Sequence, residues 1–75
     1  MKNVDLSSLA KAWPSAIVAR SEVAKFSGGA IGARRLANLD SQGLGPRGRM
    51  RLGRRVCYRV SELIDWLEAR AEILD

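Results

Sequence analysis

The fold depends most on residues 33–60, which read ARRLANLDSQGLGPRGRMRLGRRVCYRV. At the start of this stretch, Leu36 and Leu39 stand three residues apart, which is the spacing of the buried side of a helix. Gly43 follows, and glycine readily adopts the left-handed conformation that ends a helix. We therefore expect a helix over residues 33–41 with its apolar side toward a core.

The second half of the same stretch alternates between apolar and polar residues. Met50 and Leu52 are separated by an arginine, and after Gly53 the alternation resumes from Val56. Alternation with period two on both sides of a glycine-containing turn predicts a β-hairpin. We expect a two-stranded hairpin over residues 49–60, with two adjacent arginines at its tip.

A shorter helix is predicted before this stretch, over residues 20–26. Val23 and Phe26 lie three residues apart on one of its faces, and Ser21 is placed to cap it. Two glycines then separate this helix from the helix at 33–41. A helix, a short turn containing glycine and a second helix form a helix-turn-helix pair.

The last helix is predicted to begin at Ser61, with an apolar stripe of period 3.6. The stripe consists of Leu63, Ile64, Trp66, Leu67, Ala71 and Leu74. We expect Trp66 and Leu67 at the centre of the core. The predicted fold class is therefore mainly α with a small β-hairpin, a winged helix-turn-helix of three helices and a two-stranded wing.

Length and composition favour one small binding domain. The chain has 75 residues, which we divide into a partly ordered N-terminal tail over residues 1–16 and a winged helix-turn-helix domain over residues 17–75. It has no histidine and one cysteine, Cys57, so the commonest general base and the usual zinc ligands are missing. We expect a protein that is not an enzyme and has no catalytic residue, metal, cofactor or small-molecule substrate.

The sequence gives no indication of a membrane protein. No apolar run approaches the ~20 residues that cross a bilayer. The first residues lack the charged and apolar pattern of a signal peptide. We expect a cytoplasmic protein without membrane contact.

Charge is distributed unevenly along the chain. Residues 34–59 hold eight arginines and a single acid, Asp40, whereas residues 60–75 hold five acids and one arginine. Arginine offers a planar fork of donors that suits phosphates and guanine edges. The middle of the chain is therefore the predicted nucleic-acid-binding surface, and the acidic last helix is expected to face away from it.

The polar side of the helix at 33–41 is predicted to contact bases. Arg34, Asn38 and Ser41 recur at i, i+4 and i+7, opposite the apolar side, and Arg35 stands beside them. Arginine can bind guanine through two hydrogen bonds, and asparagine can bind adenine in the same way. The second helix of a helix-turn-helix enters the major groove, so these residues would read base edges there.

The hairpin is predicted to contact DNA beside that groove. Arg54 and Arg55 at its tip would reach a minor groove or the flanking phosphates. Arg47, Arg49 and Arg51 lead to the hairpin and would mostly contact phosphate. The complete predicted set of DNA-binding residues is Arg34, Arg35, Asn38, Ser41, Arg47, Arg49, Arg51, Arg54 and Arg55.

These motifs resemble the helix-turn-helix domain of excisionases and AlpA-type regulators, which have a MerR-like winged-helix fold. The resemblance rests on SEVA at 21–24, ARRLANLDS at 33–41, RLGRRV at 51–56 and SEL at 61–63, with the glycines between them, Tyr58 and the Trp-Leu pair at 66–67. It implies sequence-specific binding of double-stranded DNA by an architectural factor for site-specific recombination, in a phage or mobile element. It also implies an integrase, or neighbouring copies of the chain on DNA, as protein partners.

Other functions fit the same residues and stay open at this point. The same chemistry suits a small transcriptional regulator of the AlpA or MerR type, or the DNA-binding module of a phage terminase. A protein-interaction domain would instead use the acidic last helix and Trp13, a residue that we otherwise expect as a cap over the core. Single-stranded RNA is less favoured, because it needs exposed aromatic platforms and we expect Phe26 and Tyr58 in the core.

Overall fold

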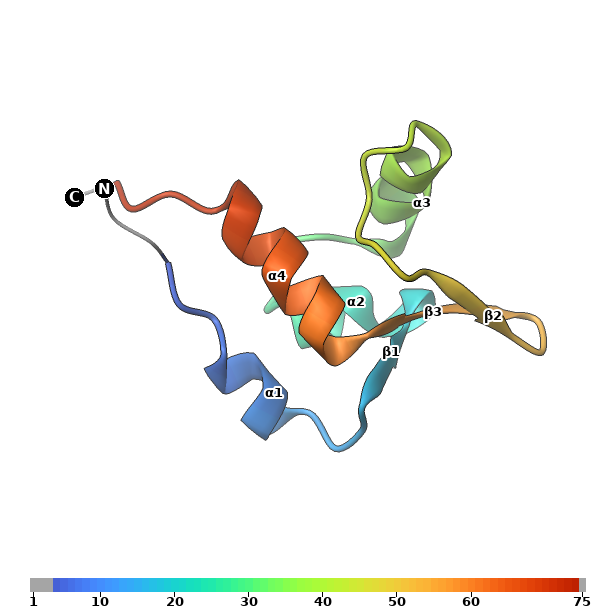
Figure 1. Cartoon of the computed structure of the whole chain (residues 1–75), viewed down its shortest axis with the longest axis horizontal. Coiled ribbons are helices and arrows are strands. Elements are labelled where there is room, and N and C mark those ends of the chain that lie inside the picture. The colour runs from blue at the N-terminus through green and yellow to red at the C-terminus, as the bar shows by residue number, and fades with distance from the viewer. Residues whose placement is uncertain (1–3, 75) are drawn as a thin grey trace.

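A computed structural model describes residues 4–74, which form a mixed fold of helices and one antiparallel sheet (Figure 1). The helices are α1 (Ser8–Ala12), α2 (Val23–Phe26), α3 (Ala33–Ser41) and α4 (Val60–Arg70), with a 3-10 turn, η1 (Arg20–Glu22), before α2. The strands are β1 (Ile17–Ala19), β2 (Met50–Leu52) and β3 (Arg55–Arg59). Residues 1–3 of the predicted tail and Asp75 of the predicted domain lie outside the described residues.

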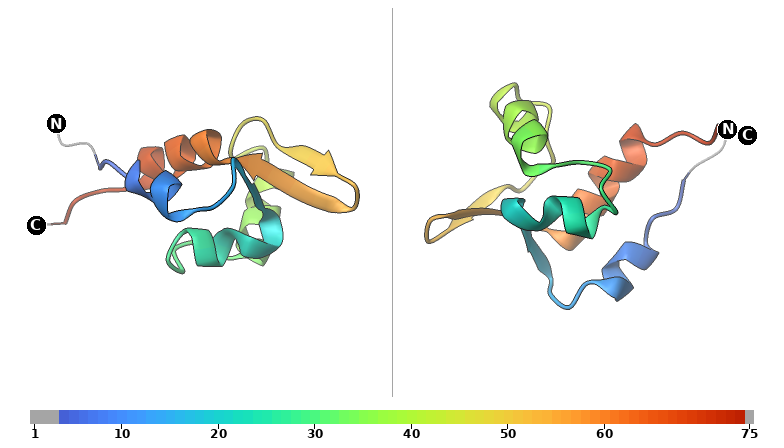
Figure 2. Two further views of the ribbon diagram at one scale, coloured as in Figure 1. Left: turned by 90° about the horizontal axis from the view of Figure 1, so that it is seen from below. Right: turned by 180° about the vertical axis from the view of Figure 1, so that it is seen from behind.

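The predicted hairpin is confirmed as β2 and β3, which pair in antiparallel fashion. Leu52 pairs with Arg55, so Gly53 and Arg54 form a two-residue loop in which Gly53 has φ +64°. A positive φ in such a short loop matches the right-handed twist of the strands. Figure 2 shows the hairpin as an arm that extends beyond the helices.

The prediction of a two-stranded wing is wrong in one respect, because β1 adds a third strand to the sheet. The strand order is β1-β3-β2, and Val18 of β1 lies opposite Tyr58 of β3. Three residues are too few to show alternation, so the sequence indicated only a short apolar segment here. The expectation of three helices is likewise wrong for residues 4–74, which contain four α-helices.

The helix predicted at 20–26 is shorter than expected. It begins as the 3-10 turn η1, and only four residues continue as α2. Ser21 does not cap it, since its hydroxyl instead accepts a hydrogen bond from Arg55 Nη1 at 3.2 Å. The prediction for α3 is confirmed, with Gly32 in the N-cap position.

The core lies between one face of the sheet and the helices. It comprises Val18, Val23, Phe26, Ile31, Leu36, Tyr58, Val60, Leu63 and Ile64, so Phe26 and Tyr58 lie in the core as predicted. Trp66 and Leu67 are only partly buried, which corrects their expected place at its centre. The buried residues of α4 are Val60, Leu63 and Ile64, all in its first two turns after β3, whereas Trp66 and Leu67 lie further along the helix.

The end of α4 also differs from the expectation. The helix ends at Arg70, so Ala71 and Leu74 of the predicted stripe lie outside the helix, and Leu74 is 86% exposed. Ser61 is not the N-cap, a position that Arg59 takes without a side-chain hydrogen bond. Within residues 4–74, no helix combines the length and apolar character that crossing a membrane requires.

The described part of the predicted tail packs against α4. The Leu6 amide donates a hydrogen bond to Glu68 Oε2 at 2.7 Å. The Trp13 ring meets the Phe26 ring edge to face, with ring centroids 5.3 Å apart. Trp13 therefore covers one side of the core, as the sequence predicted.

Candidate nucleic-acid interface

One face of α3 presents polar side chains to solvent. Leu36 on the opposite face is fully buried, whereas Arg34, Asn38 and Ser41 are exposed. These three residues lie along one line of the helix because each is three or four positions from the next. The Ser41 hydroxyl donates to the Asn38 carbonyl oxygen at 2.8 Å, which leaves its lone pairs free to accept.

Arg35 lies apart from this row. One position along a helix is a rotation of about 100°, which turns Arg35 away from Arg34 and toward α4. There it lines a cavity of about 350 Å³ together with Trp66 and Arg70. The structure therefore brings Arg34, Asn38 and Ser41 together on one line and does not add Arg35 to it.

A network of charged groups under α3 joins four parts of the chain. Asp40 Oδ2 accepts hydrogen bonds from Arg20 Nη2 at 2.7 Å and from the Tyr58 hydroxyl at 2.5 Å. Arg20 Nε also donates to the Tyr58 hydroxyl oxygen at 2.9 Å, and Arg49 Nη1 lies 3.8 Å from the same Asp40 oxygen. The Asp40 side chain, only 3% exposed, thus links α3 to η1, to β3 and to the loop before β2.

The sequence contains a signal for this network in the position of Asp40 on α3. Asp40 follows Leu36 by four residues, so both lie on the same face of α3. A carboxylate on the buried side of a helix needs a cationic partner and further hydrogen bonds to offset its desolvation. Arg20 was not predicted as that partner, because only the pairing of β1 with β3 brings it there.

The burial of Asp40 removes the one acid of residues 34–59 from the surface. All eight arginines of residues 34–59 are exposed, whereas Asp40, the only acid in that range, is buried. The carboxylate forms an ion pair with Arg20 at 2.7 Å and a longer one with Arg49 at 3.8 Å. No exposed carboxylate of residues 34–59 therefore interrupts the cationic surface.

The hairpin arginines divide between its two faces. Arg51 lies opposite Val56, and Arg55 lies opposite Leu52, so the two arginines project to opposite sides of the ribbon. Arg49, directly before β2, contacts Asp40 of α3.

The remaining predicted contacts lie elsewhere. Arg54 is exposed in the loop at the tip of the hairpin. Arg47 lines a cavity of about 390 Å³ with the acidic Glu62 and Asp65 of α4. The structure therefore links Arg49 with α3, and it places Arg47 beside acidic residues of α4 and Arg55 on the face of the hairpin opposite Arg51.

The surroundings change the ionisation of two members of the network. Burial, together with the hydrogen bond and the negative charge of Asp40, raises the pKa of Tyr58 to about 12. Desolvation alone would lower the pKa of Arg20, but its hydrogen bonds to Tyr58 and Asp40 outweigh that effect and raise it. Arg20 therefore stays charged, and Tyr58 stays a neutral donor, throughout the physiological range.

This ionisation can be measured directly, because Tyr58 is the single tyrosine of the chain. We expect the phenolate absorbance band of the folded protein to appear with a midpoint near pH 12, against the usual value of 10.0 in the urea-unfolded chain. Since the folded pKa is the higher one, this contribution to stability is complete below the unfolded pKa and is lost as pH rises toward the folded pKa. A folded-state midpoint near the unfolded value would contradict the network.

Comparisons with protein-family models, with curated protein sequences and with solved structures find no match to this chain. The candidate interface therefore rests on its own geometry and charge. Within residues 4–74, no group of three or more His, Cys, Asp or Glu side chains is placed to hold a metal ion. Cys57 is a free thiol buried in β3.

Proposed function

We propose that this protein binds double-stranded DNA in a sequence-specific manner, as a winged helix-turn-helix. In this proposal, α2, the glycine turn and α3 form the helix pair, and the β2–β3 hairpin with β1 at its base is the wing. The second helix of such a pair enters the major groove, where arginine and asparagine recognise guanine and adenine. Arg34 and Asn38 are therefore the proposed base-reading residues, with Ser41 beside them.

The observation that carries this proposal is the contrast between eight exposed arginines and one buried acid in residues 34–59. Arginines that no exposed acid neutralises bind phosphates and release their condensed counterions. Arg47 does not belong to this surface, because it shares a cavity with Glu62 and Asp65 of α4. The negative charge gathers instead on α4 and the segment after it. In this proposal α4 stays away from the duplex, and Arg49 and Arg51 contact phosphate.

We extend the proposal to an excisionase-like architectural role in site-specific recombination, in the cytoplasm. The hairpin that reaches beyond the helices supports it, because such an arm can follow the duplex into a neighbouring groove (Figure 2). An integrase, or further copies of the chain on adjacent DNA, are the partners that this role implies.

The proposal predicts a loss of sequence preference when the base-reading residues are truncated. Arg34→Ala and Asn38→Ala should each weaken binding of the preferred duplex by about 1–3 kcal/mol, and each should relax the preference at one base position. The preferred duplex is first selected from a random pool, and affinities are then measured by fluorescence anisotropy at several salt concentrations.

Two matched variants separate base recognition from the sequence-independent attraction of arginine to the DNA phosphates. Arg51→Ala should weaken all duplexes alike and reduce the slope of log K against log salt by about one unit. Arg70→Ala removes the same charge from α4 and should leave both affinity and preference nearly unchanged. Equal effects of Arg34→Ala and Arg70→Ala would rule out α3 as the recognition helix.

A further inference from the structure

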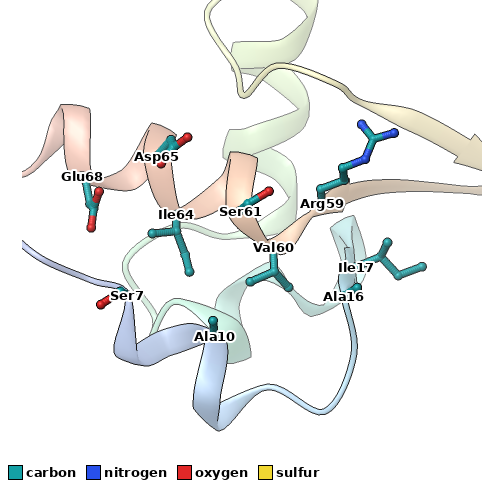
Figure 3. Close-up of a pocket in the computed structure, with 10 residues that line it drawn as sticks. All are labelled: Ser7, Ala10, Ala16, Ile17, Arg59, Val60, Ser61, Ile64, Asp65 and Glu68. Atoms are coloured by element: carbon teal, nitrogen blue, oxygen red, sulfur yellow. The ribbon is translucent and has the colours of Figure 1, made fainter.

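A groove lies between α1 and α4, on the far side of α4 from α3 (Figures 1 and 3). It has a volume of about 600 Å³, within the range of ligand-binding clefts. Its apolar lining is formed by Ala10, Ala16, Ile17, Val60 and Ile64. Figure 3 shows Val60 and Ile64 pointing from α4 toward Ala10 of α1.

Two carboxylates stand at this groove, and the structure gives neither of them a cationic partner. Asp65 and Glu68 both line it from α4, and neither forms an ion pair with any of residues 4–74. Figure 3 shows the Glu68 carboxylate directed toward α1, whereas Asp65 lies at the outer edge, points away from α1 and also lines the cavity with Arg47. One oxygen of Glu68 accepts a hydrogen bond from the Leu6 amide. This bond holds the carboxylate in place but does not neutralise its negative charge. The groove thus combines an apolar floor with an acidic rim.

The one cation that lines the groove is directed away from it. Arg59 contributes to the wall at the end of β3. Its guanidinium group runs toward the loop before β2, where Nη1 lies 3.1 Å from the position that a Cβ on Gly48 would take (Figure 3). The carboxylates of α4 therefore set the charge of the rim.

We propose that this groove binds a basic amphipathic segment of another protein. Apolar side chains of the segment would fill the floor, as in the helix-in-groove mode of peptide recognition. Lysine or arginine beside them would pair with Glu68 and, at the outer edge of the groove, with Asp65, and an acidic segment would be repelled. Because the same carboxylates repel phosphate, the groove stays free when DNA occupies α3 and the hairpin.

A second copy of the chain is the competing occupant. Its hairpin tip carries Leu52, which is 47% exposed, next to Arg54, and so offers similar chemistry. That tip is part of the proposed DNA-binding surface, so a second copy could not use it for DNA while it occupied the groove. A separate protein in the groove leaves the tip available for DNA. The two occupants differ in whether the protein alone associates, which the experiment measures.

The test is selection from a displayed library of random peptides, each long enough for three helical turns, on the immobilised full chain. Selected peptides are expected to combine leucine, isoleucine or phenylalanine with lysine or arginine. An Ala10→Arg variant places a long cation in the groove and should reduce binding of the selected peptides by about tenfold or more. The matched Ala12→Arg variant, at an exposed position of the same helix that does not line the groove, should bind them as the wild type does.

Other results would overturn this assignment. They are an absence of enrichment, selection of acidic or uncharged peptides, or an equal loss in the two α1 variants. Sedimentation of the protein alone adds one more: self-association that Ala10→Arg abolishes would assign the groove to a second copy. Both variants should retain DNA affinity, so the outcome is independent of the function proposed for α3.

Discussion

An Asp40→Ala variant is expected to lose about 3 kcal/mol of its free energy of unfolding, a large part of the stability of so small a domain. The substitution removes the acceptor shared by Arg20 and Tyr58 and leaves a largely buried guanidinium without its counter-charge. The Arg20 side chain is 25% exposed, so water recovers part of the loss, and the expected value stands at the lower end of the range for buried pairs. Urea unfolding followed by tryptophan fluorescence measures the change.

Asp65→Ala is the matched control for this variant. It removes the same group from an exposed position on α4 that forms no ion pair in residues 4–74, and should change the free energy of unfolding by less than about 0.5 kcal/mol. Arg49→Ala should also have a small effect, because Arg49 is 48% exposed and 3.8 Å from the carboxylate. Equal stability of the Asp40→Ala and Asp65→Ala variants would show that the buried network contributes nothing.

The Asp40 network connects stability to the proposed function. Asp40 belongs to the helix that carries Arg34 and Asn38, and its partners belong to η1 and β3. Hydrogen bonds to a charged acceptor are directional, so they fix how α3 lies against the sheet. A buried ion pair is a poor source of net stability compared with apolar packing, and its more useful contribution here is that orientation.

Elements with a local pattern could be predicted from the sequence. The i, i+3 spacing of Leu36 and Leu39 was sufficient for α3, and alternation around Gly53 was sufficient for the hairpin. Both patterns depend on residues that are close together in the chain. Strand β1 has no such pattern, because its three residues become a strand only by pairing with β3 about 40 positions later.

The sequence predicted which residues of the candidate site are exposed on α3 better than it predicted how the arginines are arranged around that helix. Periodicity placed Arg34 and Asn38 on the exposed face of α3, where the structure has them. It could not show that Arg35 turns toward α4, or that Arg51 and Arg55 lie on opposite faces of the ribbon. Those facts depend on how the elements pack against one another, and so does the burial of Asp40, which the charge count treated as an ordinary surface acid.

Gly45→Ala is the second substitution with a large expected effect, about 2–3 kcal/mol of destabilisation. Gly45 has no unusual backbone conformation, so the reason is space and not φ. A Cβ at this position would overlap Oδ1 of Asp40 and approach its Cγ to 2.9 Å. Because Oδ2 of the same carboxylate is held by Arg20 and Tyr58, the group cannot move aside without breaking those hydrogen bonds.

A double-mutant cycle tests this explanation against a general intolerance of the loop. In the Asp40→Ala background the carboxylate is gone, and the Cα of residue 40, 3.3 Å from the added methyl group, requires only a small shift. Gly45→Ala should then cost less than about 1 kcal/mol, so the two substitutions should be strongly non-additive. Additive losses in urea unfolding would place the effect of Gly45 in the loop itself, before the buried Pro46, and would separate it from the carboxylate that orients α3.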